Sequence, residues 1–123
     1  MHFDANSVIP LYQQVADAFT AGILSGAFPE GDQIPSTTEV SRQYQLNPAT
    51  VLKGMNQLVA AGLIEKRRGL GMFVTTGAQA KLKAQRQSAF YSEQVAALVQ
   101  TAKELGVSKA DLLAAIERGY GHE

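Results

Sequence analysis

The sequence predicts a mostly α-helical fold with one small β-hairpin, arranged as a winged helix-turn-helix that is followed by a two-helix tail. Two local signals predict the helices: apolar residues recur at three- and four-residue steps, and helix-capping residues precede these runs. A run of β-forming residues around two glycines predicts the hairpin. We therefore expect two domains in the 123 residues, the winged helix-turn-helix at 1–77 and the helical tail at 78–123.

The first predicted helix begins at Pro10 and ends before Gly26. Proline suits the first helical position because the N–H that it lacks would have no partner there. Glycine readily adopts the left-handed conformation that ends many helices. One apolar stripe of roughly four turns is formed by Leu11, Val15, Ala18, Phe19, Gly22 and Ile23.

Capping signals predict the next two helices. Ser36 and Glu39 form an S-x-x-E capping box, so a short helix should begin at Ser36. Asn47 followed by Pro48 predicts a third helix that ends close to Gly62. The residues expected to face the core are Val51, Met55, Leu58 and Val59. The outward face should hold Ala49, Thr50, Lys53 and Gln57, with Leu52 near its margin.

The stretch LIEKRRGLGMFVTT follows the third helix and predicts a two-stranded hairpin with a glycine-rich tip. Two short helices joined by a tight turn, followed by such a hairpin, make a winged helix-turn-helix. The run of Lys66, Arg67 and Arg68 stands beside the tip, where cationic side chains can reach phosphates or a narrow minor groove.

The tail is predicted to hold a long helix from residue 78 to 105 and a shorter one that opens at Ser108. A seam with a/d spacing is formed in the first by Tyr91, Val95, Leu98, Ala102 and Leu105, and the second carries Leu112, Leu113 and Ile116. Two helices of this size cannot enclose a core of their own. We therefore expect residues 78–123 to be a dimerisation segment that packs against a second copy of the chain.

Composition excludes most enzymatic and metal chemistry. The chain has no cysteine, and its two histidines, His2 and His122, stand at the two ends. Thiolate zinc sites, a Ser-His triad and a histidine cluster are therefore excluded, and we expect no metal, no cofactor and no catalysis. Because the sequence has no secretory signal and no apolar run long enough to span a membrane, we expect a cytoplasmic protein without a membrane partner.

The charge of the chain is zero overall but segregated along it. Residues 1–41 have five acidic and no basic residues, residues 42–86 have a net charge of +7, and residues 87–123 have a net charge of −2. Such a concentration of positive charge is typical of a surface that binds a polyanion, although a solvated basic face would give the same count.

The stretch from Pro10 to Val74 resembles the DNA-binding domain of GntR-family bacterial transcriptional regulators. The segments that carry the resemblance are PLYQQVADAFTAGILSGAFPEGDQIPS and NPATVLKGMNQLVAAGLIEKRRGLGMFV. Asn47-Pro48-x-Thr50-Val51 and the tail SEQVAALVQTAKELGVSKADLLAAI are similar to the YtrA subfamily in particular. The resemblance implies a homodimeric repressor that binds an inverted-repeat operator in double-stranded DNA, and the subfamily often controls genes of ABC-type transporters.

The resemblance, together with the charge pattern, assigns the expected DNA-binding residues. They are Ser36, Thr38, Asn47, Pro48, Ala49, Thr50, Lys53, Arg67, Arg68, Gly69, Leu70 and Gly71. Three positions depart from the family pattern: Thr38 replaces a frequent arginine, Pro48 replaces an arginine found in most GntR proteins although it is normal for the subfamily, and Gln45 stands where glycine is frequent. A left-handed backbone at Gln45 would cost about 1 kcal/mol.

A second hypothesis keeps the fold but changes the partner. The missing arginine at Thr38 would also suit a protein-interaction module whose winged helix does not read DNA sequence. A single palindromic footprint on DNA would exclude that alternative. The sequence identifies no small-molecule effector, because the tail is too short to enclose a ligand cavity by itself.

Overall fold

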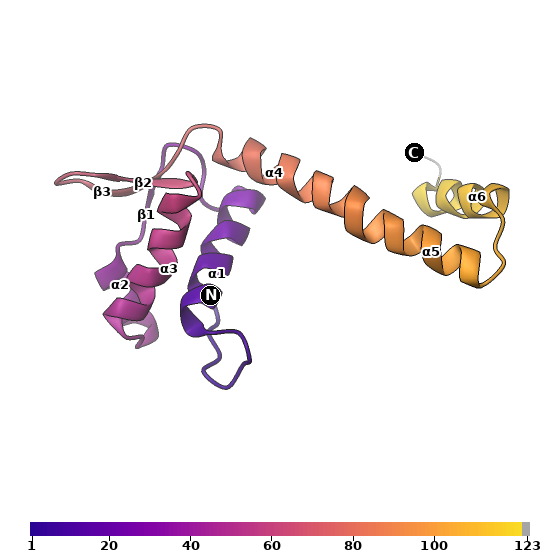
Figure 1. The fold of residues 1–123 in the computed structure, drawn as a ribbon. Coiled ribbons are helices and arrows are strands. Elements are labelled where there is room, and N and C mark those ends of the chain that lie inside the picture. The colour runs from indigo at the N-terminus through magenta and orange to yellow at the C-terminus, as the bar shows by residue number, and fades with distance from the viewer. Residues whose placement is uncertain (122–123) are drawn as a thin grey trace. The chain divides into compact units, whose positions relative to one another are not determined.

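The computed structural model describes residues 1–121, so His122 lies outside the described residues (Figure 1). The chain divides into two compact units, the first comprising residues 1–83 and the second beginning at residue 84. The first unit thus extends past residue 77, because Ala78 and Leu82 are buried in its core.

Three helices of the first unit lie at the predicted signals, although the first begins one residue later than expected, because Pro10 has an extended ψ of 147° and is the N-cap and not the first helical residue. They are α1 (Leu11–Ser25), α2 (Thr37–Tyr44) and α3 (Pro48–Ala60). Ser36 and Glu39 form the predicted capping box, in which Ser36 Oγ accepts from the Glu39 N–H at 3.1 Å. Asn47 Oδ1 caps α3 by accepting from the Ala49 N–H at 2.8 Å. Gly26 ends α1 with a φ of 87°.

The hairpin consists of β2 (Ile64–Arg67) and β3 (Gly71–Val74), and it is part of a larger sheet than predicted. A two-residue strand, β1 (Gln33–Ile34), pairs antiparallel with β3, so that the strand order is β1-β3-β2. A strand of two residues is too short to show the alternation that predicts longer strands, which is why the sequence indicated only two. Figure 1 shows that β2 and β3 extend beyond the helices of this unit as a wing.

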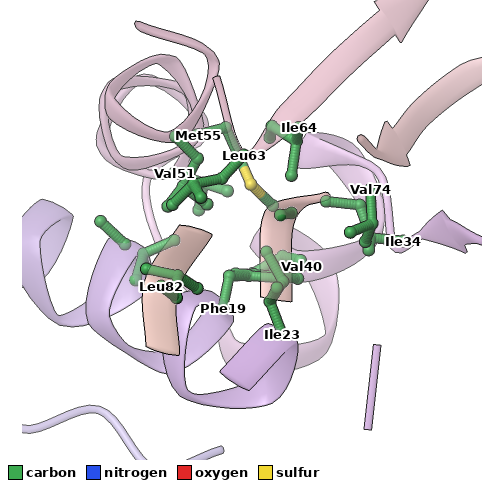
Figure 2. Close-up of a cluster of buried hydrophobic side chains, with 14 residues drawn as sticks. Phe19, Ile23, Ile34, Val40, Val51, Met55, Leu63, Ile64, Val74 and Leu82 are labelled. Carbon is green, nitrogen blue, oxygen red and sulfur yellow. The ribbon is translucent and has the colours of Figure 1, made fainter. Parts of the chain in front are cut away.

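The core of the first unit lies where α1, α2, α3 and the sheet meet, with Leu82 of α4 (Ala78–Ala89) at its edge (Figure 2). Phe19, Val51 and Met55 are fully enclosed there. Val59 does not face this core as expected but is 40% exposed. The inward positions of α3 are taken instead by Val51, Gly54, Met55 and Leu58.

Gly54 sets how closely α3 approaches α1. A Cβ atom at this position would lie 2.6 Å from the carbonyl oxygen of Tyr12 and 3.0 Å from the side chain of Val15. These separations are shorter than ordinary van der Waals contacts, so the observed packing of the two helices requires glycine. Gln45, at the turn between α2 and α3, has φ 54° and ψ 46°, which is the left-handed conformation considered above.

The second unit contains most of the predicted tail but not one uninterrupted α-helix. Between α4 and α5 (Ala96–Glu104) the chain forms a π-helical segment, Phe90–Val95. Within it the rings of Phe90 and Tyr91 lie edge to face at a centroid distance of 5.5 Å. Ser108 caps the last helix, α6 (Lys109–Tyr120), as predicted. Within residues 1–121, no helix combines the length and apolar character needed to cross a membrane.

Candidate nucleic-acid interface

A groove of about 350 Å³ runs between α3, the start of α2 and the wing. We call it the helix–wing groove. It is lined by Ser36, Thr37, Thr38, Leu52, Asn56, Val59, Lys66, Gly71 and Met72. Its floor is apolar, and its margins carry hydroxyl, amide and ammonium groups. Such a surface can contact base edges and phosphates at the same time.

The wing separates its basic residues between two faces. Because side chains alternate along a strand, Lys66 lies on the same face of β2 as the buried Ile64 and is directed toward the helix–wing groove. Met72 is its partner on β3 and lines the same groove.

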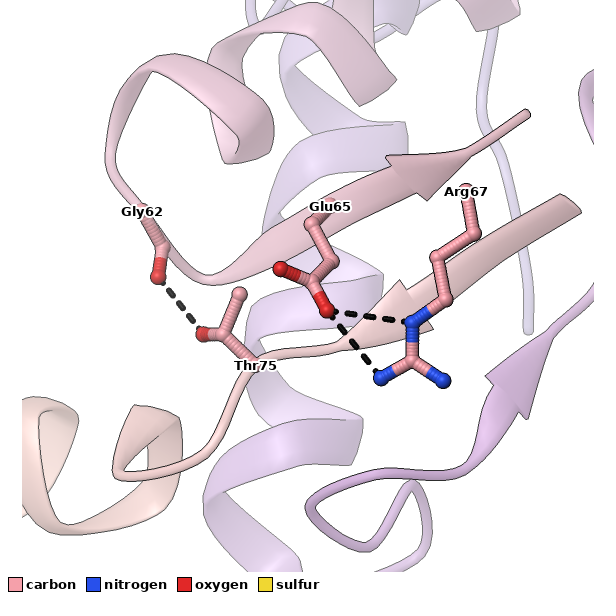
Figure 3. A network of polar contacts seen from close by, with 4 residues as sticks. All are labelled: Gly62, Glu65, Arg67 and Thr75. Carbon is pink, nitrogen blue, oxygen red and sulfur yellow. Dashed lines mark hydrogen bonds and ion pairs between the residues drawn. The ribbon is translucent and has the colours of Figure 1, made fainter.

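Arg67 lies on the opposite face of the wing and is already paired. Its Nε and Nη2 atoms donate to Glu65 Oε1 at 3.1 and 3.0 Å (Figure 3). Its guanidinium also stands 4.2 Å from the centre of the Phe73 ring. At the base of the same hairpin, Thr75 Oγ1 donates to the Gly62 carbonyl oxygen at 2.7 Å. The structure therefore places Arg67 in the outer surface of the sheet, away from the groove.

The wing tip consists of Arg68, Gly69 and Leu70. The Leu70 N–H donates to the Arg67 carbonyl at 2.9 Å, and Gly69 has a φ of 76° at the third position of this turn, as a type II turn requires. Arg68 is exposed, Leu70 is 66% exposed, and open space surrounds the Gly69 Cα. Gly71 follows the turn with a φ of 128°, and a Cβ atom at this position would meet the side chain of Gln33. This small, exposed tip can approach a DNA backbone closely.

The first residues of α3 precede the part of the helix that lines this groove, which begins at Leu52. Pro48 and Ala49 are exposed, Thr50 is half-buried, and the side chain of Asn47 is used for capping. Lys53 is exposed on α3, but its Nζ atom lies 3.9 Å from the centre of the Tyr12 ring. This cation–π contact holds the ammonium on the side of α3 that faces α1.

Sequence reasoning selected Ser36, Thr38 and Gly71 among the groove residues but omitted Thr37, Asn56 and Met72. It placed Lys66 in the basic run that can reach phosphates but did not include it among the expected DNA-binding residues. Spacing in the sequence could have identified two of these residues. Asn56 is seven residues after Ala49, or two helical turns, so the two lie on the same face of the helix. Lys66 is two residues after the apolar Ile64, so the two lie on the same face of the strand.

In the second unit, an apolar hollow of about 450 Å³ lies between α5 and α6. We call it the tail hollow. Five of the predicted dimerisation residues line it: Val95, Leu98, Ala102, Leu113 and Ile116. Val99 and Val107 line it as well, whereas Tyr91, Leu105 and Leu112 are not part of its lining. Across residues 1–121, no three carboxylates or imidazoles cluster as metal ligands.

The comparisons with known proteins agree with this architecture. Residues 11–74 match the model of the family described as "Bacterial regulatory proteins, gntR family". The chain is 29% identical over 108 residues to the uncharacterized HTH-type transcriptional regulator YhcF of Bacillus subtilis, covering 88% of each chain. It is 30% identical over 107 residues to the HTH-type transcriptional repressor YtrA of the same organism, covering 87% of this chain and 82% of that one.

A crystal structure of a transcriptional regulator from Oenococcus oeni superposes with a TM-score of 0.81 at 25% identity, covering 98% of this chain and 99% of that one. The family match spans α1 to the end of β3, which are the elements that build the helix–wing groove. The chain therefore belongs to the GntR family and is a DNA-binding transcriptional regulator of the YtrA-like type, not an enzyme.

Proposed function

We propose that the protein is a cytoplasmic repressor that binds an inverted-repeat operator as a homodimer. The helix–wing groove and the wing tip form its DNA-contacting surface. The observation that carries this proposal is that Lys66 of the wing lines one groove together with Leu52 and Asn56 of α3, while Arg68 is exposed at the wing tip. A helix and an adjacent hairpin with this charge fit a major groove and the neighbouring phosphates.

Phosphate contacts supply most of the affinity in this proposal. Lys66, Arg68 and Lys53 are the basic side chains of α3 and the wing that remain exposed without a carboxylate partner among the described residues. Lys53 reaches a phosphate by leaving the Tyr12 ring. That contact is worth only about 0.5–1 kcal/mol at an exposed site, so a phosphate competes with it readily. Three phosphates per protomer give about six per dimer, and log K should then fall with log salt with a slope near −5.

The tail hollow supports the dimeric part of the proposal. Leu98, Leu113 and Ile116 are each at least 40% exposed, although they are large and apolar. A contiguous apolar surface of this kind is typical of an interface. A second copy that covers it through twofold symmetry would present two DNA-binding surfaces, and the operator would then be an inverted repeat. Because the YtrA subfamily often controls genes of ABC-type transporters, such genes are the first candidates for regulation.

Selection of bound sequences from random DNA tests this function. The expected result is one enriched inverted repeat, bound at a ratio of two protomers per duplex, with a steep salt dependence. No enriched sequence, or an affinity that does not change with salt, would contradict the proposal.

The alternative function is a protein-interaction module. It is favoured by Thr38, which lines the helix–wing groove with a hydroxyl instead of a cation, and by the pairing of Arg67 with Glu65. A nuclease footprint separates the two, because an interaction module would protect no specific site.

A further inference from the structure

We propose that α3 recognises A·T base pairs, with Leu52 packing against the methyl group of a thymine and Asn56 hydrogen-bonding to the major-groove edge of an adenine. This inference rests on the proposed DNA-binding surface and adds the class of base pair that the surface reads. Operators of this protein should then have an A·T pair at the position that Leu52 contacts in each half-site.

Leu52 and Asn56 belong to one exposed strip of α3. Ala49, Leu52 and Asn56 follow one another at steps of three and four residues, so they lie above one another on one side of the helix. The buried residues Val51 and Met55 each precede a residue of the strip and lie on the neighbouring, core-facing side of the helix, about 100° away. Leu52 is 48% exposed, and both Leu52 and Asn56 line the helix–wing groove.

Their spacing fits neighbouring bases. Four residues of α-helix rise about 6 Å, which is roughly two base-pair steps. The two side chains can therefore contact bases that are close to each other in one half-site.

The strip lacks the groups that recognise guanine. Guanine is read mainly by arginine or lysine, which donate to its O6 and N7 atoms. The one basic residue of α3 is Lys53, whose ammonium lies over the Tyr12 ring and which the proposed function assigns to a phosphate. Lys66 is the one charged side chain among the described residues that line the groove; it comes from β2 of the wing and not from α3, and the proposed function assigns it to a phosphate as well. The base-facing strip thus presents methyl and amide groups.

These groups match the chemistry of adenine and thymine. Leucine and alanine side chains contact the thymine methyl, and asparagine pairs with adenine N6 and N7 through two hydrogen bonds. The Asn56 amide is available for this role, because it makes no hydrogen bond to another described residue, whereas the Asn47 amide is used in the cap of α3. An exposed leucine beside a free amide therefore indicates readout of an A·T pair.

The test uses the full-length protein and the duplex obtained by selection. In one series each thymine of a half-site is replaced by uracil, which removes the methyl group and keeps the hydrogen bonds. In a second series each adenine is replaced by 7-deazaadenine, which removes the N7 acceptor. Affinities are measured by fluorescence anisotropy at one fixed salt concentration.

For the unmodified protein, uracil at one position should weaken binding about fourfold, which is the effect of leaving one methyl group unburied. Leu52→Ala should remove this sensitivity to uracil, whereas the control Val8→Ala, which shortens an exposed apolar side chain outside the groove, should retain it. Replacement of one adenine by 7-deazaadenine should weaken binding at least fivefold (about 1 kcal/mol), and Asn56→Ala should remove that effect.

Three results would overturn the inference. They are selected half-sites with an invariant G·C pair at the contacted position, equal affinity for thymine and uracil duplexes, and a uracil penalty that persists in Leu52→Ala. Because the uracil series on the unmodified protein tests the inference by itself, it does not depend on how the variants fold. Specific binding without these effects contradicts only the inference, whereas failure to bind any selected duplex contradicts the proposed function as well.

Discussion

Lys66 and Arg67 are neighbours in the sequence, yet their replacement by glutamine should change DNA binding in different ways. Lys66 lines the helix–wing groove, whereas Arg67 is on the other face of the sheet and is held by Glu65 and Phe73. Lys66→Gln should therefore remove a phosphate contact from each protomer. Arg67→Gln should leave the contacts with DNA nearly unchanged.

The magnitude follows from counterion release. One phosphate contact contributes about 0.9 to the slope of log K against log salt, so its loss from both protomers of a dimer changes the slope by roughly 1.8. A slope near −5 would become a slope near −3. Between 50 and 200 mM salt, the affinity of the unmodified protein should fall about twelvefold more than that of Lys66→Gln.

The assay is a salt series measured by anisotropy on the selected operator, with Arg67→Gln as the matched control. That control keeps the same loss of formal charge one residue away, so a nonspecific effect of net charge would appear equally in both variants. Equal slopes for the two variants, or a larger change in Arg67→Gln, would refute the assignment of the two wing faces. The effect of Arg67→Gln should appear instead as a small decrease in thermal stability. The decrease should be small because an exposed ion pair contributes only about 0.2–1 kcal/mol to the free energy of unfolding.

Three further predictions concern stability and assembly. Gln45→Gly should raise the free energy of unfolding by about 0.5–1 kcal/mol because it relieves the left-handed backbone; a higher urea midpoint at unchanged slope would show this, and a lower midpoint would contradict it. Gly54→Ala should lower the free energy of unfolding by about 1–3 kcal/mol through overpacking against α1, although alanine favours helices. Gly119→Ala, where a Cβ meets nothing within 4 Å, is its control and should not destabilise in the same chemical denaturation series. Leu113→Asp should place a charge in the tail hollow and convert dimers to monomers in analytical ultracentrifugation, and a variant that stays dimeric would exclude the hollow as the interface.

Much of the fold could be predicted because its signals are local. Ser36 with Glu39, Asn47 with Pro48, and Gly26 each act on the few backbone groups next to them, and all three produce the expected helix end. The left-handed backbone at Gln45 was considered only because the family resemblance places a frequent glycine there, and the structure has that conformation. Features set by longer-range contacts were not predictable in this way. The two residues of β1 form a strand only because β3 is beside them, and Val59 is exposed because the packed face of α3 is formed by Val51, Gly54, Met55 and Leu58.

The types of residue in the candidate site could also be predicted from the sequence, but the contacts that its charged side chains make with other residues could not. Lys53 was expected to point outward from α3, and its contact with Tyr12 depends on the distance between α1 and α3. That distance is short because residue 54 has no side chain. The partners of Arg67 likewise depend on the register of β2 with β3, which places Phe73 opposite Glu65. Sequence patterns give the chemistry of a surface, whereas tertiary packing decides which of its charges stay free.

The basic run of the wing illustrates why position within a strand matters more than the number of charges. Lys66, Arg67 and Arg68 are consecutive, but the pleat directs the first toward the groove, the second into the outer sheet surface, and the turn carries the third to the tip. The buried Ile64 sets this division, because a shift of one residue in the register would exchange the two faces. The burial of one isoleucine in the core of the unit therefore determines which cation faces the helix–wing groove, and the chemistry of the wing is coupled to the packing of the fold.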